Sequence, residues 1–215
     1  MPKKNVQRIP FFPLNLIVFP SEPLNLHVFE PRYRQLVKDC LNLNTPFGIP
    51  PHINERTMSY GTLMEIEAVV NKYPDGRMDI KTKGIQTFYM NSFENPMEDK
   101  LYAGGSVVEI PMNDNANDAQ KWMLVEKVTE LFDLMEVNIS FDAKTPFLSF
   151  KLGHHIGLSV GQEYHLLTIP DEYKRIEYML DYVERALPIV REIERSKQRI
   201  KMNGHFKNIR FRFDE

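Results

Sequence analysis

The spacing of apolar residues changes near Pro111. Before this residue, apolar and polar positions mostly alternate, as in residues 24–28, and a period of two is typical of half-buried strands. After it, apolar residues recur every three to four positions, which is the period of helices that bury one face. The pattern predicts an α+β chain with a β-rich unit over residues 1–112 and an α-helical unit over residues 113–215.

Four prolines interrupt the apolar residues near the start of the chain. Because proline has no N–H to donate to a strand ladder, it belongs at strand ends, edges or bulges, and we expect two or three short, bent strands. A helix is predicted to begin at Pro31, since proline fits the first helical position. The interrupting prolines are Pro10, Pro13, Pro20 and Pro23, and the residues expected on the buried helix face are Tyr33, Leu36, Val37, Cys40 and Leu41.

The rest of the first half predicts a β-hairpin and further strands. The turn is at residues 73–77, where Asp-Gly tolerates positive φ, and residues 62–71 and 78–82 form its strands. Gly84 indicates a bulge or corner, and a last strand is expected over residues 106–110. Short strands in succession, with glycines at corners and one helix among them, predict a small barrel or a strongly bent sheet.

Four helices are predicted in the second half. The first begins near residue 118, and the second spans residues 146–156. The third opens with a capping box at residues 159–162, where serine and glutamine side chains can satisfy free backbone N–H groups. The fourth is long and begins after Pro170. The predicted buried stripe of the first helix is Trp122, Val125, Val128, Phe132 and Met135, and that of the last is Ile176, Leu180, Val183, Leu187 and Val190.

Length and composition are those of an ordinary globular protein. The 215 residues are 42% hydrophobic and 26% charged, and a chain of this length can bury a core without disulfides. The net charge of −2 argues against wholesale attraction to nucleic acid or membranes. Cys40 is the only cysteine, and no stretch approaches the ~18 apolar residues of a membrane span. We therefore expect a cytoplasmic protein that does not bind membranes.

Two groups of residues could have a metal-binding or catalytic role, and each also has a structural explanation. His154, His155 and His165 could bind a metal, but adjacent residues on a helix diverge by about 100°. A structural role is favoured for them, and no metal is expected. Cys40 could be a nucleophile, but its place on the apolar face of the first helix predicts an inert core thiol.

Two further groups have the same double interpretation. Glu30, Arg32 and Arg34 could form an active cluster, but we expect Glu30 to cap the helix and an arginine to pair locally. Methionines in the β-rich half could form an adaptable apolar surface or fill an irregular barrel core. These methionines are Met58, Met64, Met78, Met90 and Met97.

The C-terminal residues are basic. Residues 191–215 hold eight Lys or Arg and four Asp or Glu, with Phe206, Phe211 and Phe213 among them. Basic residues with aromatic neighbours can bind nucleic acid, whereas a solvated helix end is the simpler interpretation. RNA binding by the barrel and this tail is the alternative function, although nucleic acid is not the expected partner.

Several motifs occur in an order that resembles one known family. They are Pro-Phe-Phe-Pro-Leu at 10–14, Val-Phe-Pro at 18–20, Val-Phe-Glu-Pro-Arg-Tyr at 28–33, Pro-Phe-Gly-Ile at 46–49 and Pro-Asp-Gly at 74–76. Over roughly residues 8–190 the chain resembles the Lon-type substrate-binding domain, the N-terminal module of ATP-dependent Lon proteases. The resemblance implies a PUA-like β pseudo-barrel followed by an α-helical bundle.

The resemblance also implies a recognition module and not a protease. The sequence contains no Gly-x-x-x-x-Gly-Lys-Ser/Thr motif and no Gly-Lys pair, so it has no phosphate-binding loop of that type. We expect the chain to end where the family's ATPase would begin, with no catalytic residues and no cofactor. The implied partners are unfolded or apolar protein segments, and a separate protease could act with this protein.

The binding surface is expected in an apolar groove between barrel and bundle, or along a free strand edge. A third function, small-molecule sensing, ranks last. In a Lon-like protein that binds a small molecule, the pocket belongs to an added zinc domain, and the cysteines of that domain are absent here. The candidate protein-binding residues are Phe12, Leu14, Phe19, Phe29, Met58, Met90, Phe93 and Met97.

Overall fold

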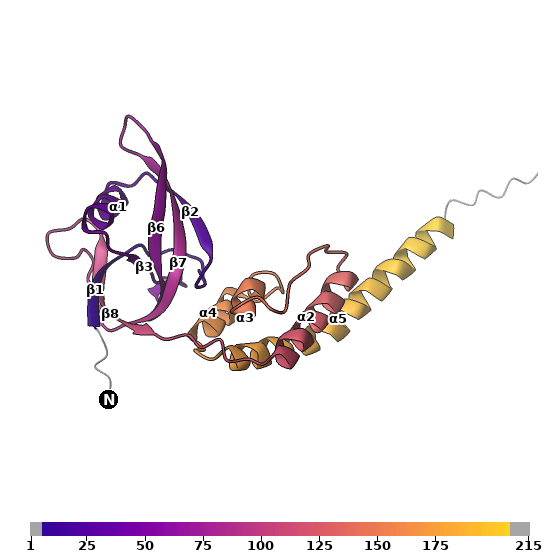
Figure 1. The fold of residues 1–215 in the computed structure, drawn as a ribbon. Coiled ribbons are helices and arrows are strands. Elements are labelled where there is room, and N and C mark those ends of the chain that lie inside the picture. Colours follow the sequence, from indigo (N-terminus) through magenta and orange to yellow (C-terminus); the bar gives the residue numbers. More distant parts are fainter. Residues whose placement is uncertain (1–5, 207–215) are drawn as a thin grey trace, which may run out of the picture.

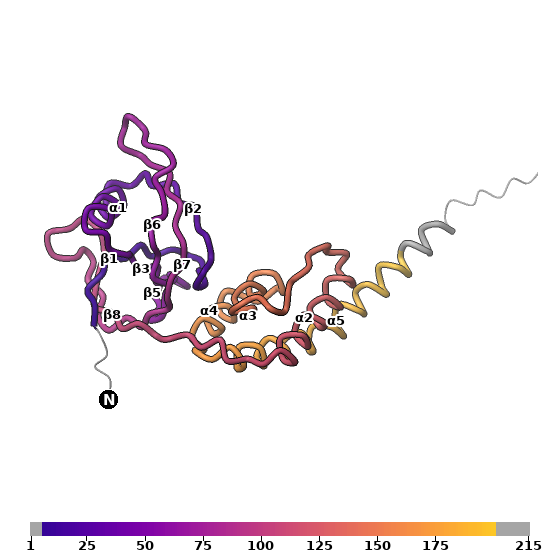
Figure 2. The backbone as a smooth tube through the Cα atoms, viewed as in Figure 1, coloured from indigo at the N-terminus to yellow at the C-terminus, as the bar shows by residue number. Residues whose placement is uncertain are grey.

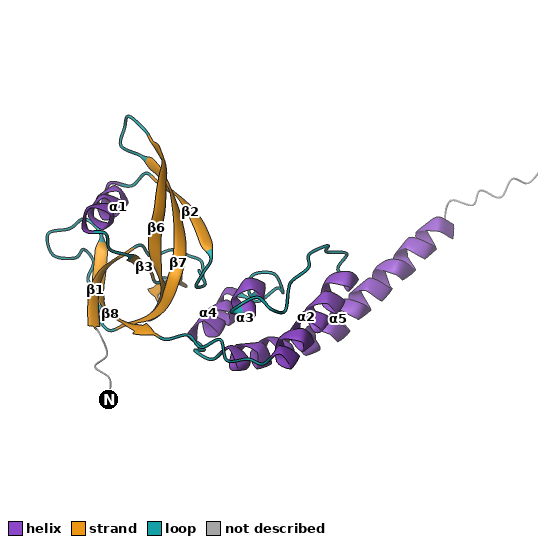
Figure 3. Cartoon of the chain, viewed as in Figure 1, coloured by secondary structure: helices purple, strands orange, loops and turns teal. Residues whose placement is uncertain are grey.

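The computed structural model describes the backbone of residues 6–206 and the side chains of residues 6–200. The described strands and helix α1 come first along the chain, and helices α2 to α5 follow (Figures 1 and 3). The strands are β1 (Val6–Phe11), β2 (Pro23–Val28), β3 (Phe47–Ile49), β4 (His52–Ile53), β5 (Arg56–Thr57), β6 (Tyr60–Lys72), β7 (Met78–Met90) and β8 (Ala103–Ile110). The helices are α1 (Pro31–Leu43), α2 (Asp118–Leu134), α3 (Leu148–Leu152), α4 (Val160–Thr168) and α5 (Glu172–Phe206).

Within the described residues, six strands form a barrel-like sheet, which we call the barrel together with α1. The strand order is β2-β7-β6-β3-β1-β8, and β8 also pairs with β7. β7 pairs with β2 through its first half and with β8 through its last residues. Helices α2 to α5 form the bundle (Figure 1). The structure confirms the predicted α+β class, a β pseudo-barrel followed by an α-helical bundle.

The predicted hairpin and bulge are present. β6 and β7 are joined by a turn in which Gly76 has a φ of 85°. A shift in the β6–β7 register leaves Ile85 as an extra residue beside Gly84. A Cβ atom on Gly84 would lie 2.5 Å from the carbonyl oxygen of Phe19, so glycine lets the β1–β2 loop approach this strand.

The last strand begins earlier than predicted. β8 starts at Ala103 rather than Ser106, because Gly105 stays in the ladder opposite Ile9. A Cβ atom on Gly105 would lie 1.9 Å from the carbonyl oxygen of Ser92. This glycine therefore serves a close approach of two backbone segments and not a corner.

Helix α1 follows the prediction closely. It starts at Pro31 and ends at Leu43, and the C-cap residue Asn44 adopts the left-handed conformation with a φ of 49°. Leu41 is the exception, since it was expected on the buried face and is 43% exposed. The buried residues of the helix are Tyr33, Leu36, Val37 and Cys40.

The predicted stripe of α2 is partly wrong. Trp122 and Met135 are 56% and 51% exposed, although both were expected in the core. They were assigned to the core because they are large and apolar. Large apolar side chains often remain on surfaces, so hydrophobicity alone does not determine which face of a helix is buried. The buried apolar residues of α2 are Leu124, Val128, Leu131 and Phe132.

Helix α3 is shorter than predicted. It spans five residues rather than residues 146–156, because Phe147 before it has a left-handed φ of 50°. Gly153 follows it, where a Cβ atom would lie 2.6 Å from the ring of Phe19. The predicted capping box of α4 is confirmed, with Ser159 and Gln162 each accepting a backbone N–H of the other.

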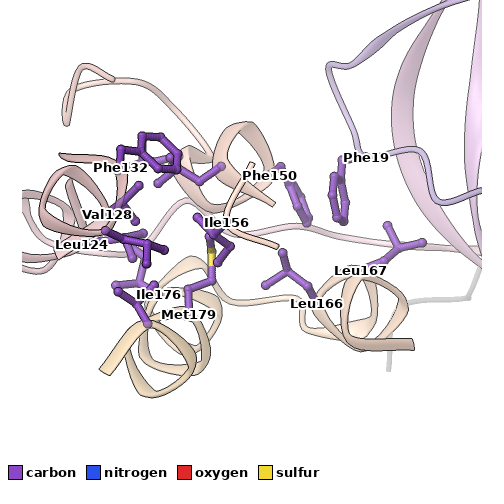
Figure 4. Close-up of a cluster of buried hydrophobic side chains, with 14 of the residues drawn as sticks. Phe19, Leu124, Val128, Phe132, Phe150, Ile156, Leu166, Leu167, Ile176 and Met179 are labelled. Carbon is purple, nitrogen blue, oxygen red and sulfur yellow. The ribbon is translucent and has the colours of Figure 1, made fainter. Parts of the chain in front are cut away.

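The core of the bundle extends into the barrel. Ile17 and Phe19 of the β1–β2 loop are 3% and 0% exposed and belong to the bundle's hydrophobic cluster. The ring of Phe19 lies 5.1 Å from that of Phe150 (Figure 4). Phe12 and Val18, from the same segment, pack in the barrel core. The chain also crosses from barrel to bundle through the linker after β8 (Figure 2).

Candidate functional site

A groove lies on the barrel beside the start of α1. It consists of two adjoining hollows of about 510 Å³ and about 260 Å³. The β1–β2 loop, the end of β2, the start of α1, the β4–β5 hairpin and the β7–β8 loop all contribute to its walls. The residues common to both hollows are Pro13, Leu14, Arg32 and Tyr33.

Four aromatic side chains, Phe12, Phe29, Tyr33 and Phe93, contribute to the lining of the groove. The rings of Phe12 and Tyr33 stack with centroids 3.7 Å apart, and Phe12 is only 6% exposed, so this pair forms a buried base. Phe29 is 59% exposed in the smaller hollow, and Phe93 is 40% exposed in the larger one. The ring of Phe93 stacks on Phe11 at 6.0 Å. Exposed rings supported by buried ones can bind apolar side chains.

Polar groups border these rings. The guanidinium of Arg32 lies 4.5 Å from the centre of the Tyr33 ring and pairs with Glu30 at 2.8 Å. His52 Nδ1 lies 3.2 Å from the hydroxyl of Thr57. Burial raises the pKa of Tyr33, so its hydroxyl remains protonated and able to donate a hydrogen bond. A few polar groups beside apolar walls can orient the backbone of a bound peptide.

Backbone hydrogen bonds join two walls of the groove. The N–H of His52 donates to the carbonyl oxygen of Leu14 at 2.7 Å. Leu14 also forms a parallel bridge with Pro51, whose carbonyl oxygen accepts the N–H of Met58 at 2.8 Å. The β1–β2 loop and the β4–β5 hairpin therefore form one connected structure.

The Glu30, Arg32 and Arg34 group is structural, with one difference from the expectation. Glu30 occupies the N-cap position of α1, but its side chain makes no capping hydrogen bond. It pairs with Arg32, as expected for a local ion pair. Arg34 donates to the carbonyl oxygen of Asp75 at 2.6 Å and ties α1 to the β6–β7 turn.

Half of the predicted binding residues line the groove. They are Phe12, Leu14, Phe29 and Phe93, and Phe12 contributes to its base. The surface role of these residues stays a prediction, but the structure brings them together around Tyr33. The helical period had placed Tyr33 in the core, so its second role in the groove was missed.

The other four predicted binding residues lie outside the groove. Phe19 is fully buried against the bundle, so no partner reaches it in this conformation. Met90 packs against the cluster around Phe88, and Met97 packs against the cluster around α1, as core-filling methionines do. Met58 is half-buried just after β5. The groove also lies on the barrel and not between barrel and bundle, where Phe19 fills the space.

Other groove residues gave no signal in the sequence. His52 and Asn95 both line the larger hollow, yet they are far apart along the chain. They meet because the sheet closes, which local spacing does not reveal. Arg32 was within reach of sequence analysis, since it lies in the Phe-Glu-Pro-Arg-Tyr motif.

Cys40 is an inert core thiol, as predicted. It is 2% exposed within the buried face of α1. Burial raises the pKa of its thiol to about 12, so the thiolate needed for nucleophilic attack does not form near neutral pH.

The three histidines of the bundle do not converge. His154 contacts Glu163 through Nδ1 at 2.8 Å and Glu22 through Nε2 at 3.1 Å. His155 lies against Phe141, with ring centroids 5.5 Å apart, and His165 lies edge-on to Tyr178. In the part of the chain that the structure describes, no group of three or more His, Cys, Asp or Glu side chains could hold a metal ion. The bridging contact of His154 was not predicted.

A histidine–aspartate pair lies beside a further hollow of about 380 Å³ on the outside of β2 and β7. His27 Nδ1 is 2.6 Å from an Asp79 carboxylate oxygen, and Asn71 and Tyr73 donate to the other oxygen at 2.8 Å. These hydrogen bonds, that of His27 first, lower the pKa of Asp79 to about 2. Because these side chains mostly hydrogen-bond to one another, we interpret the cluster as structural, holding β2, β6 and β7 together.

The chain is a barrel with a groove partly lined by aromatic residues, packed on a helical bundle, and comparison with known proteins identifies its family. The family described as ATP-dependent protease La (LON) substrate-binding domain matches residues 8–185, so the chain belongs to this family. Membership supports a substrate-recognition role. No helix among residues 6–206 is both long and apolar enough to cross a bilayer.

Two solved structures are similar to the chain. A Lon N-terminal domain protein from Xanthomonas campestris is 25% identical with a TM-score of 0.66, and the match covers 82% of this chain and 98% of that one. The N-terminal domain of the Mycobacterium avium complex Lon protease is 16% identical with a TM-score of 0.64, covering 83% of this chain and 98% of that one. The second likeness shows the fold alone.

Proposed function

We propose that this protein is a non-enzymatic recognition module that binds exposed apolar segments of unfolded or misfolded proteins. The observation that supports this proposal best is the groove, where Phe29 and Phe93 are exposed and the stacked rings of Phe12 and Tyr33 are buried. Membership in a substrate-binding family supports the same conclusion.

The groove offers two adjoining hollows for an extended segment. Its two hollows adjoin, so one segment can place one apolar side chain in each. Arg32, His52 and Asn95 border this path and can hydrogen-bond peptide groups, which are the same in every sequence. Such a site selects apolar character and not a particular sequence.

Three side chains that could perform covalent chemistry have structural contacts instead. The thiol of Cys40 is buried, with a pKa raised to about 12. Both ring nitrogens of His154 face carboxylates, and Asp79 fixes one nitrogen of His27. These arrangements support a binding role, with no catalytic residue, metal or cofactor proposed.

Fluorescence anisotropy tests the proposal. A labelled globular protein, reduced and carboxymethylated so that it stays unfolded, is titrated with the full chain, and its native form serves as control. We expect binding of the unfolded form only. Negligible binding of both forms would contradict the proposal.

Substitutions locate the site. Phe29→Ala and Phe93→Ala are each expected to weaken binding about tenfold, since buried aromatic anchors dominate apolar interfaces. Trp122→Ala is the matched control, because Trp122 is a similarly exposed aromatic residue, at 56%, on α2 and outside the groove. Equal losses in all three variants would place the site elsewhere.

The proposed setting is cytoplasmic proteolysis or quality control, with a separate protease as partner. The residues given contain no phosphate-binding loop of the type that powers the Lon ATPase, and in this proposal a separate protease degrades the captured segment. Co-purification from native extract, with Phe29→Ala as a control for substrate-bridged contacts, identifies such a partner.

RNA binding ranks second. The observation that favours it is the exposed basic surface of α5 at Arg195, Lys197 and Arg199, where the helix extends past α2 (Figure 1). Arg195 and Lys197 pair with glutamates on the same helix, which weakens the case. Phe206 has no described side chain, and Phe211 and Phe213 lie outside the described residues. RNA binding predicts affinity that falls steeply with salt and is lost on truncation after Val190.

A further inference from the structure

The groove and the contact between barrel and bundle use the same stretch of chain. We call residues 12–19 the shared segment. Its Leu14 lines the groove, whereas Ile17 and Phe19 are buried in the bundle core. Leu14 and Ile17 are only three residues apart, which is at most roughly 10 Å along the chain. A displacement of the bundle against the barrel therefore moves one wall of the groove.

The second wall is also anchored to the bundle. Ile53 of the β4–β5 hairpin packs against the bundle core, and its neighbour His52 lines the groove. The N–H of His52 donates to the carbonyl oxygen of Leu14 at 2.7 Å. Both walls are thus joined to each other and to the bundle.

His154 contacts both the barrel and the bundle next to these walls. His154 lies just after α3 and contacts Glu163 of α4 through one ring nitrogen and Glu22 of the barrel through the other, at 2.8 Å and 3.1 Å. Glu22 also accepts the backbone N–H of Phe19 at 2.8 Å, so the same carboxylate holds the shared segment. The ring of Phe19 lies 4.6 Å from the ring of His154. A second polar contact crosses nearby, since the N–H of Tyr60 donates to the hydroxyl of Tyr164 at 3.1 Å.

We propose that His154 controls the groove from a distance, by holding Glu22 against α4 and so keeping both groove walls in their binding geometry. For its ligand this inference rests on the proposed function, while its structural part does not. Loosening the contact leaves the walls less ordered, and a less ordered site binds more weakly. By linkage, a bound segment strengthens the barrel–bundle contact by the same factor.

Amide hydrogen exchange on the full chain tests the structural part. In His154→Gln we expect exchange about tenfold faster at Tyr60, which reports the barrel–bundle contact, and at His52, which reports the groove wall. His155→Gln is the control, because His155 is the next residue and contacts Phe141 instead. If circular dichroism shows that His154→Gln is unfolded, Glu22→Gln replaces it, with the same expectation.

Each exchange result decides the question. Faster exchange at both Tyr60 and His52, with His155→Gln unchanged, supports the inference. Faster exchange at Tyr60 alone overturns it, because the contact would then loosen without reaching the groove. No change at Tyr60 also overturns it, because His154 would then not hold the contact.

Affinity for the reduced, carboxymethylated protein tests the functional part. We expect His154→Gln to bind it about fivefold more weakly than the wild type, and His155→Gln to bind it equally well. Equal affinity in His154→Gln overturns the control of binding. If the wild type itself does not bind this probe, the proposed function fails, and the exchange result still decides whether the groove is coupled to the bundle.

Discussion

His154 joins two parts of the molecule because each of its ring nitrogens meets a carboxylate. Hydrogen bonds to Glu163 and then Glu22 raise its pKa to about 9, from about 6.5 in an unfolded chain. The charged imidazolium is therefore favoured by folding. Its stabilising contribution is fully present below about pH 6.5 and is lost as the pH rises through about 9.

This linkage predicts how the cost of removing His154 depends on pH. The side chain keeps 31% of its surface exposed, so solvent screening limits the contribution to about 1 kcal/mol. Urea unfolding of the wild type and His154→Gln should differ by about this amount near pH 6 and by much less near pH 10. The comparison cancels other groups that titrate over the same range. An equal difference at both pH values would contradict the assigned pKa.

Two phenylalanines show why the sequence predicted only part of the site. Phe19 and Phe29 each follow a valine, and each lies in a short apolar stretch near a proline. Phe19 is 0% exposed in the bundle core and Phe29 is 59% exposed in the groove. Nothing local distinguishes them, because the difference comes from a bundle whose core residues lie more than a hundred positions further along the chain. The predicted binding residues therefore include both groove residues and core residues, and their role in binding stays a prediction.

At the scale of elements, local signals predicted what local forces decide. The Asp-Gly turn, the start of α1 at Pro31 and the capping box at Ser159 were correct because each depends on residues within a few positions. The predicted stripe of α2 was partly wrong and the predicted length of α3 was wrong, because packing decides both. Gly153 ends α3 next to the ring of Phe19, a contact between distant parts of the sequence.

The first turn of α5 holds a buried ion pair that also contacts α3 and that the sequence analysis did not predict. Glu172 and Arg175 are 2.6 Å apart, and neither side chain is exposed. Glu172 also accepts hydrogen bonds from the N–H and the hydroxyl of Ser149, at 2.9 Å and 2.6 Å. Arg175 lies over the ring of Phe150 at 4.1 Å. The pair fixes α3 against the start of α5. Removal of either charge would leave the other buried without a partner.

Glu172→Gln is expected to destabilise the protein by about 3–5 kcal/mol, because the Arg175 charge would remain buried without its partner. Asp181→Asn is the matched control, since Asp181 pairs with Arg185 on the same helix, with side chains 65% and 68% exposed. We expect this change to cost less than about 0.5 kcal/mol. Chemical denaturation measures both values, and similar costs for the two variants would show that the buried pair contributes little.

At the scale of the whole molecule, the family pattern predicted the architecture and the closing of the sheet placed the groove. Residues of the β1–β2 loop, the β4–β5 hairpin and the β7–β8 loop meet only after β8 pairs with β7. The division into residues 1–112 and 113–215 remains our proposal. The shared segment bears on it, because residues from the first unit complete the core of the second.

Phe19 therefore decides whether the two proposed units unfold together. Phe19→Ala removes a fully buried ring from the bundle core, a change expected to cost about 3–5 kcal/mol. The loss falls mainly on the bundle, since the barrel core keeps Phe12 and Val18. We expect calorimetry to show one transition for the wild type and two for Phe19→Ala, with the bundle unfolding first. Phe29→Ala, with an exposed ring ten residues further along the chain, should keep a single transition. If Phe19→Ala also unfolds in one transition at a lower temperature, the contact at Phe19 does not couple the units, and the remaining contacts between barrel and bundle suffice.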